Sequence, residues 1–179
     1  MPALATTLVL GGARSGKSSF AEALVRADGR AKVYVATGTA GDDEMRARID
    51  AHRDRRGADW RIIEEPLRLT EAIAREADGR TVLLVDCLTL WLSNLMFAER
   101  NIEAETHRLT AVLEGLAGPV VLVSNEVGLG LVPETPLGRR FRDAQGRLNQ
   151  AVATVASRVV FVAAGLPLDL KPQQGAWKA

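Results

Sequence analysis

A short apolar run leads directly into a glycine-rich turn in Thr7-Leu8-Val9-Leu10-Gly11-Gly12-Ala13-Arg14-Ser15-Gly16-Lys17-Ser18. The first four residues are typical of a buried strand, and a helix is predicted over Lys17–Arg26. Between them, Gly11–Ser18 matches the pattern G-x-x-x-x-G-K-S/T completely and in the required strand–loop–helix context. Backbone N–H groups and the helix N-terminus in such a loop bind phosphate oxygens. We predict that Lys17 binds the β- and γ-phosphates and that the Ser18 hydroxyl binds Mg²⁺. The alternative is a glycine-rich turn that binds no ligand.

A second run, Val82-Leu83-Leu84-Val85, ends in Asp86. In P-loop NTPases a buried strand delivers an aspartate that holds Mg²⁺ directly or through water. The pattern is weak by itself, because many strands end in an aspartate that caps a turn. Combined with the phosphate loop, it predicts a nucleoside triphosphate bound with Mg²⁺, with Ser18 and Asp86 as the metal-linked residues.

Strands and helices alternate along the rest of the chain. The predicted strands are Thr7–Leu10, Lys32–Thr37, Asp59–Glu64, Thr81–Cys87, Pro119–Ser124 and Arg158–Ala163. The predicted helices are Lys17–Arg26, Asp42–Arg56, Leu69–Ala77, Leu88–Ala98, Glu103–Leu116 and Pro136–Ala156. In the last helix one apolar face is expected, made of Leu137, Phe141, Ala144, Leu148, Ala151 and Val155. The alternation predicts an α/β fold, a mostly parallel sheet flanked by helices, with its ligand site at the carboxyl ends of the strands.

Length and composition indicate one globular domain over residues 1–179. Hydrophobic residues make up 47% and charged residues 25% of the chain, and the formal net charge is +1. This balance excludes a general electrostatic affinity for nucleic acid or anionic membranes. No apolar run reaches the ~18 residues of a membrane span, and the first residues lack the pattern of a signal peptide. The single cysteine, Cys87, favours a reducing compartment, so the expected location is the cytoplasm.

The two histidines differ in their helical surroundings. His107 points away from the apolar stripe of its helix, so we expect it at the surface. His52 shares a stripe with Met45 and Ile49, where a histidine commonly serves packing. Four arginines lie within four positions of His52: Arg48, Arg53, Arg55 and Arg56. A neutral imidazole beside guanidinium groups is also suited to attack a phosphate whose charge they neutralise.

A regulatory GTPase would carry the motif Asn-Lys-x-Asp after a later strand. The corresponding place reads Ser124-Asn125-Glu126-Val127-Gly128, which lacks both the lysine and the aspartate. A signalling GTPase is therefore disfavoured, although guanine recognition by another route stays open.

Several blocks together resemble a known family. These are Gly11–Ser18, Tyr34–Thr37, Asp42–Met45, His52-Arg53, Trp60-Arg61, Glu64, Asp86–Thr89, Ser93–Leu95, Ser124–Pro133 and Phe141–Gln150. They resemble the bifunctional adenosylcobinamide kinase/adenosylcobinamide-phosphate guanylyltransferases over essentially the whole chain from Leu8 to Lys171. The phosphate loop is common to many families, whereas the last two blocks together are far more specific. Some family members carry a second histidine just before the one that matches His52; here that place is Ala51.

The resemblance implies a RecA-like P-loop fold and two reactions of cobalamin biosynthesis. ATP or GTP phosphorylates adenosylcobinamide, and GMP from GTP then passes through a guanylylated histidine to adenosylcobinamide phosphate, giving adenosylcobinamide-GDP and pyrophosphate. His52 would be that nucleophile, and Gly11–Ser18 would hold phosphates. The other implied nucleotide-binding residues are Ala36, Thr37, Gly38, Arg53, Asp54, Arg55, Arg56, Glu64 and Asp86. The resemblance also implies a homo-oligomer, with a trimer as the expected state.

Two alternatives stay open from the sequence. A monofunctional small-molecule P-loop kinase would use Gly138–Arg147 as an arginine-bearing lid, but it leaves His52 without a role. A nucleotide-dependent binding or regulatory module would use the Asn125–Pro133 loop as a switch that docks a partner.

Overall fold

The structure, a computed structural model, describes residues 5–38 and 59–171. Its elements are β1 (Thr7–Gly11), α1 (Lys17–Ala27), β2 (Ala31–Ala36), β3 (Trp60–Glu64), α3 (Leu69–Glu76), β4 (Thr81–Asp86), α4 (Leu88–Phe97), α5 (Ile102–Glu114), β5 (Val120–Asn125), α6 (Pro136–Val155), β6 (Arg158–Ala163) and β7 (Leu166–Lys171). Every predicted strand is present, with its bounds shifted by at most one residue. The predicted helices are also present, except that Asp42–Arg56 lies outside the described residues.

The strands form one sheet of seven in the order β3-β2-β4-β5-β1-β6-β7. All neighbouring strands are parallel except β7, which is antiparallel to β6. The prediction of a mostly parallel sheet is therefore confirmed. In this order β5 lies between β1, which leads into the phosphate loop, and β4, which ends in Asp86.

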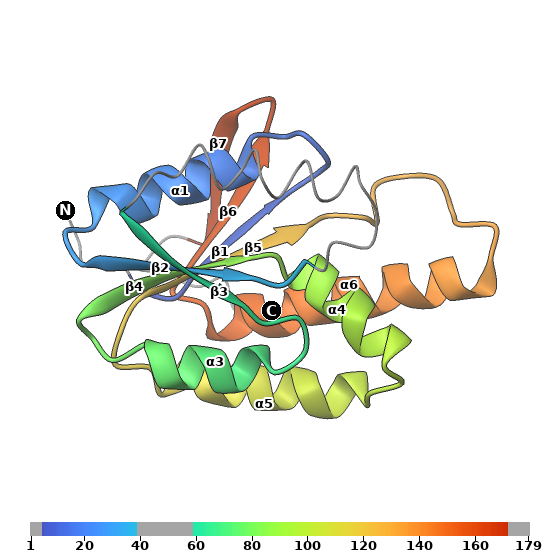
Figure 1. Cartoon of the computed structure of the whole chain (residues 1–179). Helices are drawn as coiled ribbons and strands as arrows, with labels where there is room; N and C mark the ends of the chain where they lie inside the picture. The colour runs from blue at the N-terminus through green and yellow to red at the C-terminus, as the bar shows by residue number, and fades with distance from the viewer. Residues whose placement is uncertain (1–4, 39–58, 172–179) are drawn as a thin grey trace.

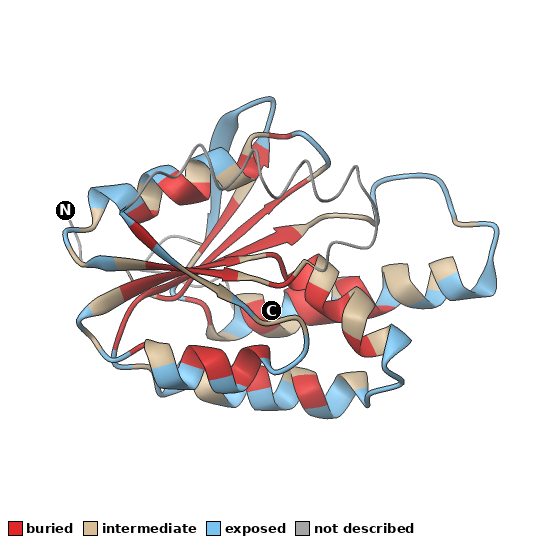
Figure 2. Ribbon diagram, in the orientation of Figure 1, coloured by how far each residue is buried: buried red, intermediate tan, exposed pale blue. Residues whose placement is uncertain are grey.

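Helices cover both faces of the sheet: α1 lies on one face, and α3, α4, α5 and α6 lie on the other (Figure 1). The central strands are apolar at nearly every position because each face meets a helix layer. Alternate residues belong to different cores, as Leu122 packs with the four-helix side and Val121 and Val123 pack with α1. Figure 2 shows this burial along the central strands, with exposed residues on the outer sides of the helices.

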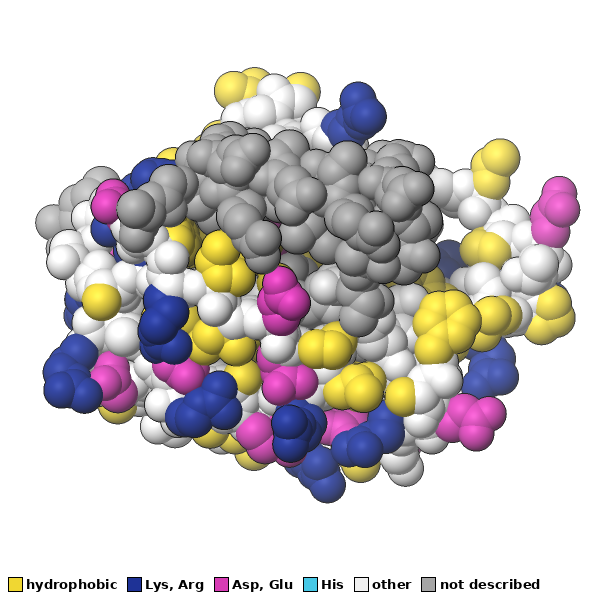
Figure 3. Space-filling view, viewed as in Figure 1, with side chains coloured by type: hydrophobic (Ala, Val, Ile, Leu, Met, Phe, Trp, Pro, Cys, Tyr) yellow, Lys and Arg dark blue, Asp and Glu magenta, His cyan; other side chains and the backbone are white. Residues whose placement is uncertain are grey.

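The outer surface over α3 and α5 carries acidic and basic side chains interspersed with one another (Figure 3). Glu76 of α3 pairs with Arg75 of the same helix and with Arg61 of β3. Such exposed pairs contribute little to stability and leave no field of a single sign on this face. None of the helices in residues 5–38 and 59–171 is long and apolar enough to cross a membrane.

One strand, β7, was not predicted. Its leucines Leu166, Leu168 and Leu170 are all more than half exposed, and Pro167 is a residue found only at sheet edges or bulges. The strand forms because Ala164 and Gly165 both have positive φ, 51° and 79°, which suits a tight hairpin from β6. The pairing with β6 therefore depends on a turn that hydrophobic patterning does not reveal.

The buried face of α6 differs from the predicted apolar face. Ala144 and Leu148 are buried as expected, but Leu137 is 54% exposed. The buried positions also include two polar residues, Gln145 and Asn149. They hydrogen-bond to the end of β5, so this face of the helix carries both packing and polar contacts. Residues 138–147 lie within this single helix and form no separate lid.

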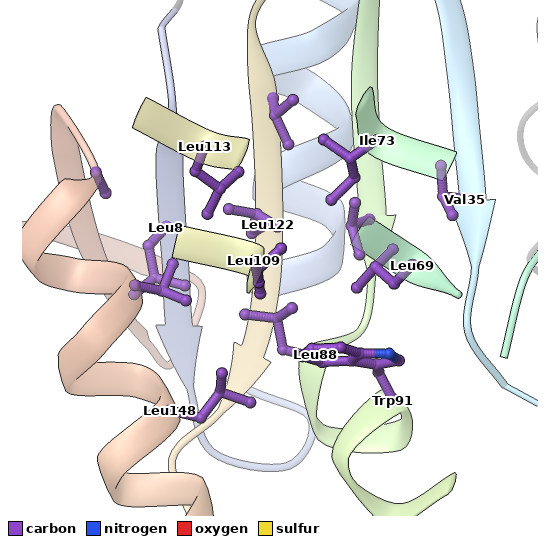
Figure 4. Packing of buried hydrophobic residues seen from close by; sticks show 14 of the residues in the cluster. Leu8, Val35, Leu69, Ile73, Leu88, Trp91, Leu109, Leu113, Leu122 and Leu148 are labelled. Atoms are coloured by element: carbon purple, nitrogen blue, oxygen red, sulfur yellow. The ribbon is translucent and has the colours of Figure 1, made fainter. Parts of the chain in front are cut away.

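We expect Leu122→Ala to lower the free energy of unfolding by about 3 kcal/mol. Leu122 is fully buried in β5, and Leu109 of α5 and Leu148 of α6 point toward this part of the sheet (Figure 4). The substitution removes contacts and leaves a cavity between β5, α5 and α6. The packed helices cannot move inward to fill this cavity. Denaturant unfolding measures the change.

The matched control is Leu170→Ala, at a residue 55% exposed on the edge strand. It should change the free energy of unfolding by no more than about 0.5 kcal/mol. Equal losses in the two variants would contradict the burial of Leu122.

Candidate active site

The phosphate loop joins the carboxyl end of β1 to the N-terminus of α1. Gly16 is the helix N-cap and has φ of 95°, a left-handed conformation that favours glycine. The Lys17 side chain is buried and turns back over the loop, with Nζ donating to the Gly12 carbonyl oxygen at 3.1 Å. Ser18 follows in the first turn of α1 and is half-buried. The loop thus gathers backbone N–H groups, a cation and a hydroxyl at one helix terminus.

The β6–β7 hairpin lies against the back of the phosphate loop. Gly165 N–H in the hairpin turn donates to the Ser15 carbonyl oxygen at 2.8 Å. A Cβ added to Gly11 would lie 2.5 Å from the Val162 carbonyl oxygen, so only glycine fits where the loop begins. The turn between β6 and β7, together with β6, therefore supports the loop.

The strand ends bring further predicted residues to the same edge. In β4, Val82 and Leu84 pack in the core on the α1 side, so Asp86 continues their row on that face. Ala36 pairs in register with Asp86 on one side and with Glu64 on the other. Glu64 is exposed at the outermost parallel strand. The sheet therefore places Asp86 and Lys17 at one edge and on one face, although they are far apart in sequence.

Thr37 ties the ends of β2 and β4 together. Its fully buried hydroxyl accepts from the Cys87 backbone N–H at 2.8 Å and donates to the Cys87 carbonyl oxygen at 2.7 Å. Asn94 of α4 donates to the Thr37 carbonyl oxygen at 2.7 Å. These bonds give Thr37 a structural role at the site, and they fix the backbone directly after Asp86.

Burial controls the ionisation of the groups around Asp86. It lowers the pKa of Lys17, while the charges of Cys87, when ionised, and of Asp86 raise this pKa in part. Burial also raises the pKa of Cys87 to about 11, and Asp86 adds to that shift. Cys87 is therefore a neutral thiol near neutral pH, where Asp86 is the negative charge that acts on Lys17.

Part of the predicted site lies beyond the described residues. His52, Arg53, Asp54, Arg55 and Arg56 fall within residues 39–58, for which the structure gives no description. Gly38 is described, and a Cβ there would lie 3.2 Å from Leu90 of α4. His107 is exposed, as the helical pattern predicts. Within residues 5–38 and 59–171, the phosphate loop, Ala36, Thr37, Gly38, Glu64 and Asp86 all belong to the carboxyl edge of the sheet or its loops.

The sequence profile of the family described as cobinamide kinase / cobinamide phosphate guanyltransferase matches residues 7–170. The chain belongs to this family. The match includes the phosphate loop, the strand that ends in Asp86 and the polar end of β5. The resemblance found in the sequence blocks is thereby confirmed.

Relatives in the cobinamide kinase family match over nearly their whole length. The bifunctional adenosylcobalamin biosynthesis protein CobP of Pseudomonas aeruginosa is 51% identical over 166 residues, covering 92% of this chain and 96% of that protein. The bifunctional adenosylcobalamin biosynthesis protein CobU of Escherichia coli is 41% identical over 179 residues, covering 92% and 98%. Both alignments therefore span most of this chain and nearly all of the relatives.

Solved structures of lower identity share the fold. The RadB recombinase matches with a TM-score of 0.51 at 15% identity, covering 88% of this chain and 73% of the other. A protein of Pyrococcus horikoshii matches with a TM-score of 0.56 at 11% identity, covering 95% and 87%. The likeness concerns the fold alone, and it confirms the RecA-like P-loop architecture of this family member.

Some residues that shape the site through tertiary contacts were not among the site residues predicted from the sequence. Gly165 supports the phosphate loop, and Thr89 at the start of α4 accepts from the Asn125 backbone N–H at 2.8 Å. Ser124, Gln145 and Asn149 form a buried hydrogen-bonded cluster beneath the end of β5. The polar residues of α6 were the available signal, since they recur at four-residue spacing on an otherwise apolar face.

We expect Cys87 in the folded protein to react with iodoacetamide at pH 8 at least about 100-fold more slowly than in concentrated guanidinium chloride. The reason is its pKa of about 11, which leaves little thiolate, together with its 6% exposure. Because Cys87 is the single cysteine of the chain, mass spectrometry reports this reaction directly.

In the folded state the rate should rise about tenfold per pH unit up to the pKa, because thiolate is the reactive form. Denatured protein serves as the internal control. Similar rates in the folded and denatured states would show that Cys87 is neither buried nor shifted.

Proposed function

We propose that this chain is a bifunctional enzyme of cobalamin biosynthesis. It phosphorylates adenosylcobinamide with ATP or GTP, and it then transfers GMP from GTP to adenosylcobinamide phosphate. The products of the second reaction are adenosylcobinamide-GDP and pyrophosphate. Membership of the family and the names of the relatives support both reactions.

The main structural support for the proposal is that Lys17 and Asp86 both lie at the carboxyl edge of the sheet. Lys17 follows β1 and Asp86 ends β4, and both belong to the face covered by α1. Ser15 Oγ belongs to the phosphate loop and is buried without a hydrogen-bond partner among the described residues. A buried hydroxyl of this kind is suited to a phosphate oxygen. A cation, free donors and a carboxylate together suit a nucleoside triphosphate with its metal.

Mg²⁺ fits the donor groups at this edge. The Ser18 hydroxyl and the Asp86 carboxylate are oxygen donors, which Mg²⁺ prefers, and its remaining positions are usually filled by phosphates and water. The described residues contain no group of three or more His, Cys, Asp or Glu suited to a metal, so an all-protein cage is not the arrangement proposed. When bound, the ion would neutralise charge on the β- and γ-phosphates.

For the kinase reaction, Lys17 would stabilise the charge that spreads over the γ-phosphoryl oxygens. The hydroxyl oxygen of adenosylcobinamide bonds to the γ-phosphorus, and the bond from that phosphorus to the β,γ-bridging oxygen breaks. The nucleoside diphosphate leaves with the electron pair. The loop backbone holds the phosphates in line, so positioning supplies much of the catalysis.

For the guanylyl transfer, His52 would be the nucleophile. Its ring nitrogen bonds to the α-phosphorus of GTP, and pyrophosphate leaves. The phosphate of adenosylcobinamide phosphate then attacks the same phosphorus, and the bond to nitrogen breaks. Arg53, Asp54, Arg55 and Arg56 would complete the nucleotide site around His52.

Three expectations accompany this function. The chain would form a single catalytic domain over residues 1–179 and would assemble as a homo-oligomer, with a trimer as the expected state. Its use of ATP and GTP suits the cytoplasm. Size-exclusion chromatography with light scattering tests the assembly.

We expect Lys17→Ala to slow γ-phosphoryl transfer to adenosylcobinamide by about 10²–10³-fold. The substitution removes the charge nearest the transferred phosphate. A corrinoid-dependent assay with γ-labelled GTP measures the rate. Lys32→Ala, on β2, is the control and should keep the wild-type rate; a Lys17→Ala rate within about threefold of wild type would contradict the phosphate-loop role.

We expect His52→Asn to abolish covalent attachment of GMP while retaining most of the γ-phosphoryl transfer. Asparagine has a similar reach but cannot form the phosphoramidate. Incubation with α-labelled GTP, followed by gel analysis for acid-labile label, measures the intermediate.

The matched control is His107→Asn, at the exposed histidine of α5. It should keep full covalent labelling. A labelled His52→Asn protein would refute this nucleophile, and absence of label in the wild type would favour a monofunctional kinase. Nucleotide hydrolysis without transfer to a corrinoid would favour a regulatory module.

A further inference from the structure

The end of β5 lies between the two halves of the nucleotide site. Asn125, its last residue, pairs in register with Gly11 at the start of the phosphate loop. On its other side β5 pairs with β4, the strand that ends in Asp86. Any group projecting from the end of β5 therefore stands between Lys17 and Asp86.

The alternation of β5 places the Asn125 side chain on the catalytic face. Val121 and Val123 pack in the core beneath α1, whereas Ser124 hydrogen-bonds with Gln145 and Asn149 of α6 on the opposite face. Because successive side chains point to opposite faces, Asn125 shares the face of Val123. That is the face of Asp86 and of the α1 N-terminus.

The backbone of Asn125 is held from both neighbouring layers. Its N–H donates to Thr89 Oγ1 at 2.8 Å, and its carbonyl oxygen accepts from Asn149 Nδ2 at 3.1 Å. Asn149 is itself oriented, because its Oδ1 accepts from Ser124 Oγ at 2.7 Å and from Gln145 Nε2 at 2.9 Å. Such support fixes a functional group more firmly than a free loop does.

The side-chain amide of Asn125 takes no part in this support. It is half-buried, and in residues 5–38 and 59–171 no hydrogen bond to it is present. The next residue differs, since the Glu126 carboxylate accepts from the Gly128 backbone N–H of its own loop. An amide offers two N–H donors without bringing a negative charge near phosphates.

We propose that Asn125 is a further catalytic residue, whose amide N–H donates to the γ-phosphoryl group carried by the phosphate loop. This role rests on the proposed kinase function. In the transfer the acceptor hydroxyl oxygen bonds to phosphorus, the bond to the β,γ-bridging oxygen breaks, and the hydroxyl proton passes to solvent. Asn125 exchanges no proton; it stabilises the charge on the transferred group. It thereby also distinguishes a nucleoside triphosphate from a diphosphate.

The test uses Asn125→Ala, which removes the amide, and Asn125→Asp, which keeps the size of the side chain but adds a negative charge. We expect γ-phosphoryl transfer to fall about 10²-fold in the first variant and further in the second. Calorimetric titration should show about tenfold weaker binding of a non-hydrolysable GTP analogue, with GDP binding unchanged. A merely structural role would weaken both nucleotides alike.

The control is Asn101→Asp at the N-cap of α5, where the side-chain oxygen accepts from the Ala104 N–H. Aspartate is an equally good N-cap, so this variant should match the wild type in both measurements. Thermal denaturation verifies folding. If Asn125→Ala does not fold, the rate and binding measurements are made on Asn125→Asp. If neither variant folds, Asn125 has a structural role and the proposal is overturned.

The proposal would also be overturned if folded Asn125→Ala or Asn125→Asp kept a kinase rate within about threefold of wild type. It would be overturned too if these variants lost affinity for the GTP analogue and for GDP equally. If the wild type transfers no phosphate to the corrinoid, the proposed function fails. The comparison of the two nucleotides still decides the role of Asn125 in that case.

Discussion

The strands β1, β4 and β5 are covered by helices on both faces, so a charge at their centres would lie buried without solvent. Polar groups are therefore excluded from most of each strand and are admitted at its carboxyl end. The parallel arrangement then collects Gly11, Asp86 and Asn125 at one edge. The proposed chemistry depends on this constraint, because it brings together residues that are distant in sequence.

The two faces of the sheet have different uses at that edge. On the α1 side lie Lys17 and Asp86, which are proposed to meet the nucleotide. On the opposite side, the Thr37 hydroxyl hydrogen-bonds to the backbone of Cys87, and the Ser124 hydroxyl hydrogen-bonds to α6. Strand alternation separates the two sets, so the backbone near the site is held without using the groups that bind ligand.

Close backbone contact supports the phosphate loop from behind. Gly165 of the hairpin donates to Ser15, and the carbonyl oxygen of Val162 lies where a side chain at Gly11 would have to go. The turn that begins the unpredicted strand β7 therefore contacts the phosphate loop. Its leucines remain outside both apolar cores, so its contribution to the loop comes through the turn rather than through burial.

The sequence by itself determined the strand and helix alternation, the phosphate loop and the strand ending in Asp86. These follow from local signals, namely hydrophobic period and a contiguous motif. Only the tertiary structure decided that β5 lies between β1 and β4, that β7 forms, and that Gln145 and Asn149 of α6 hold Asn125. Strand order and hydrogen bonds between distant residues arise from packing in three dimensions, and a hydrophobic pattern records only which side chains are buried, not which partners they meet.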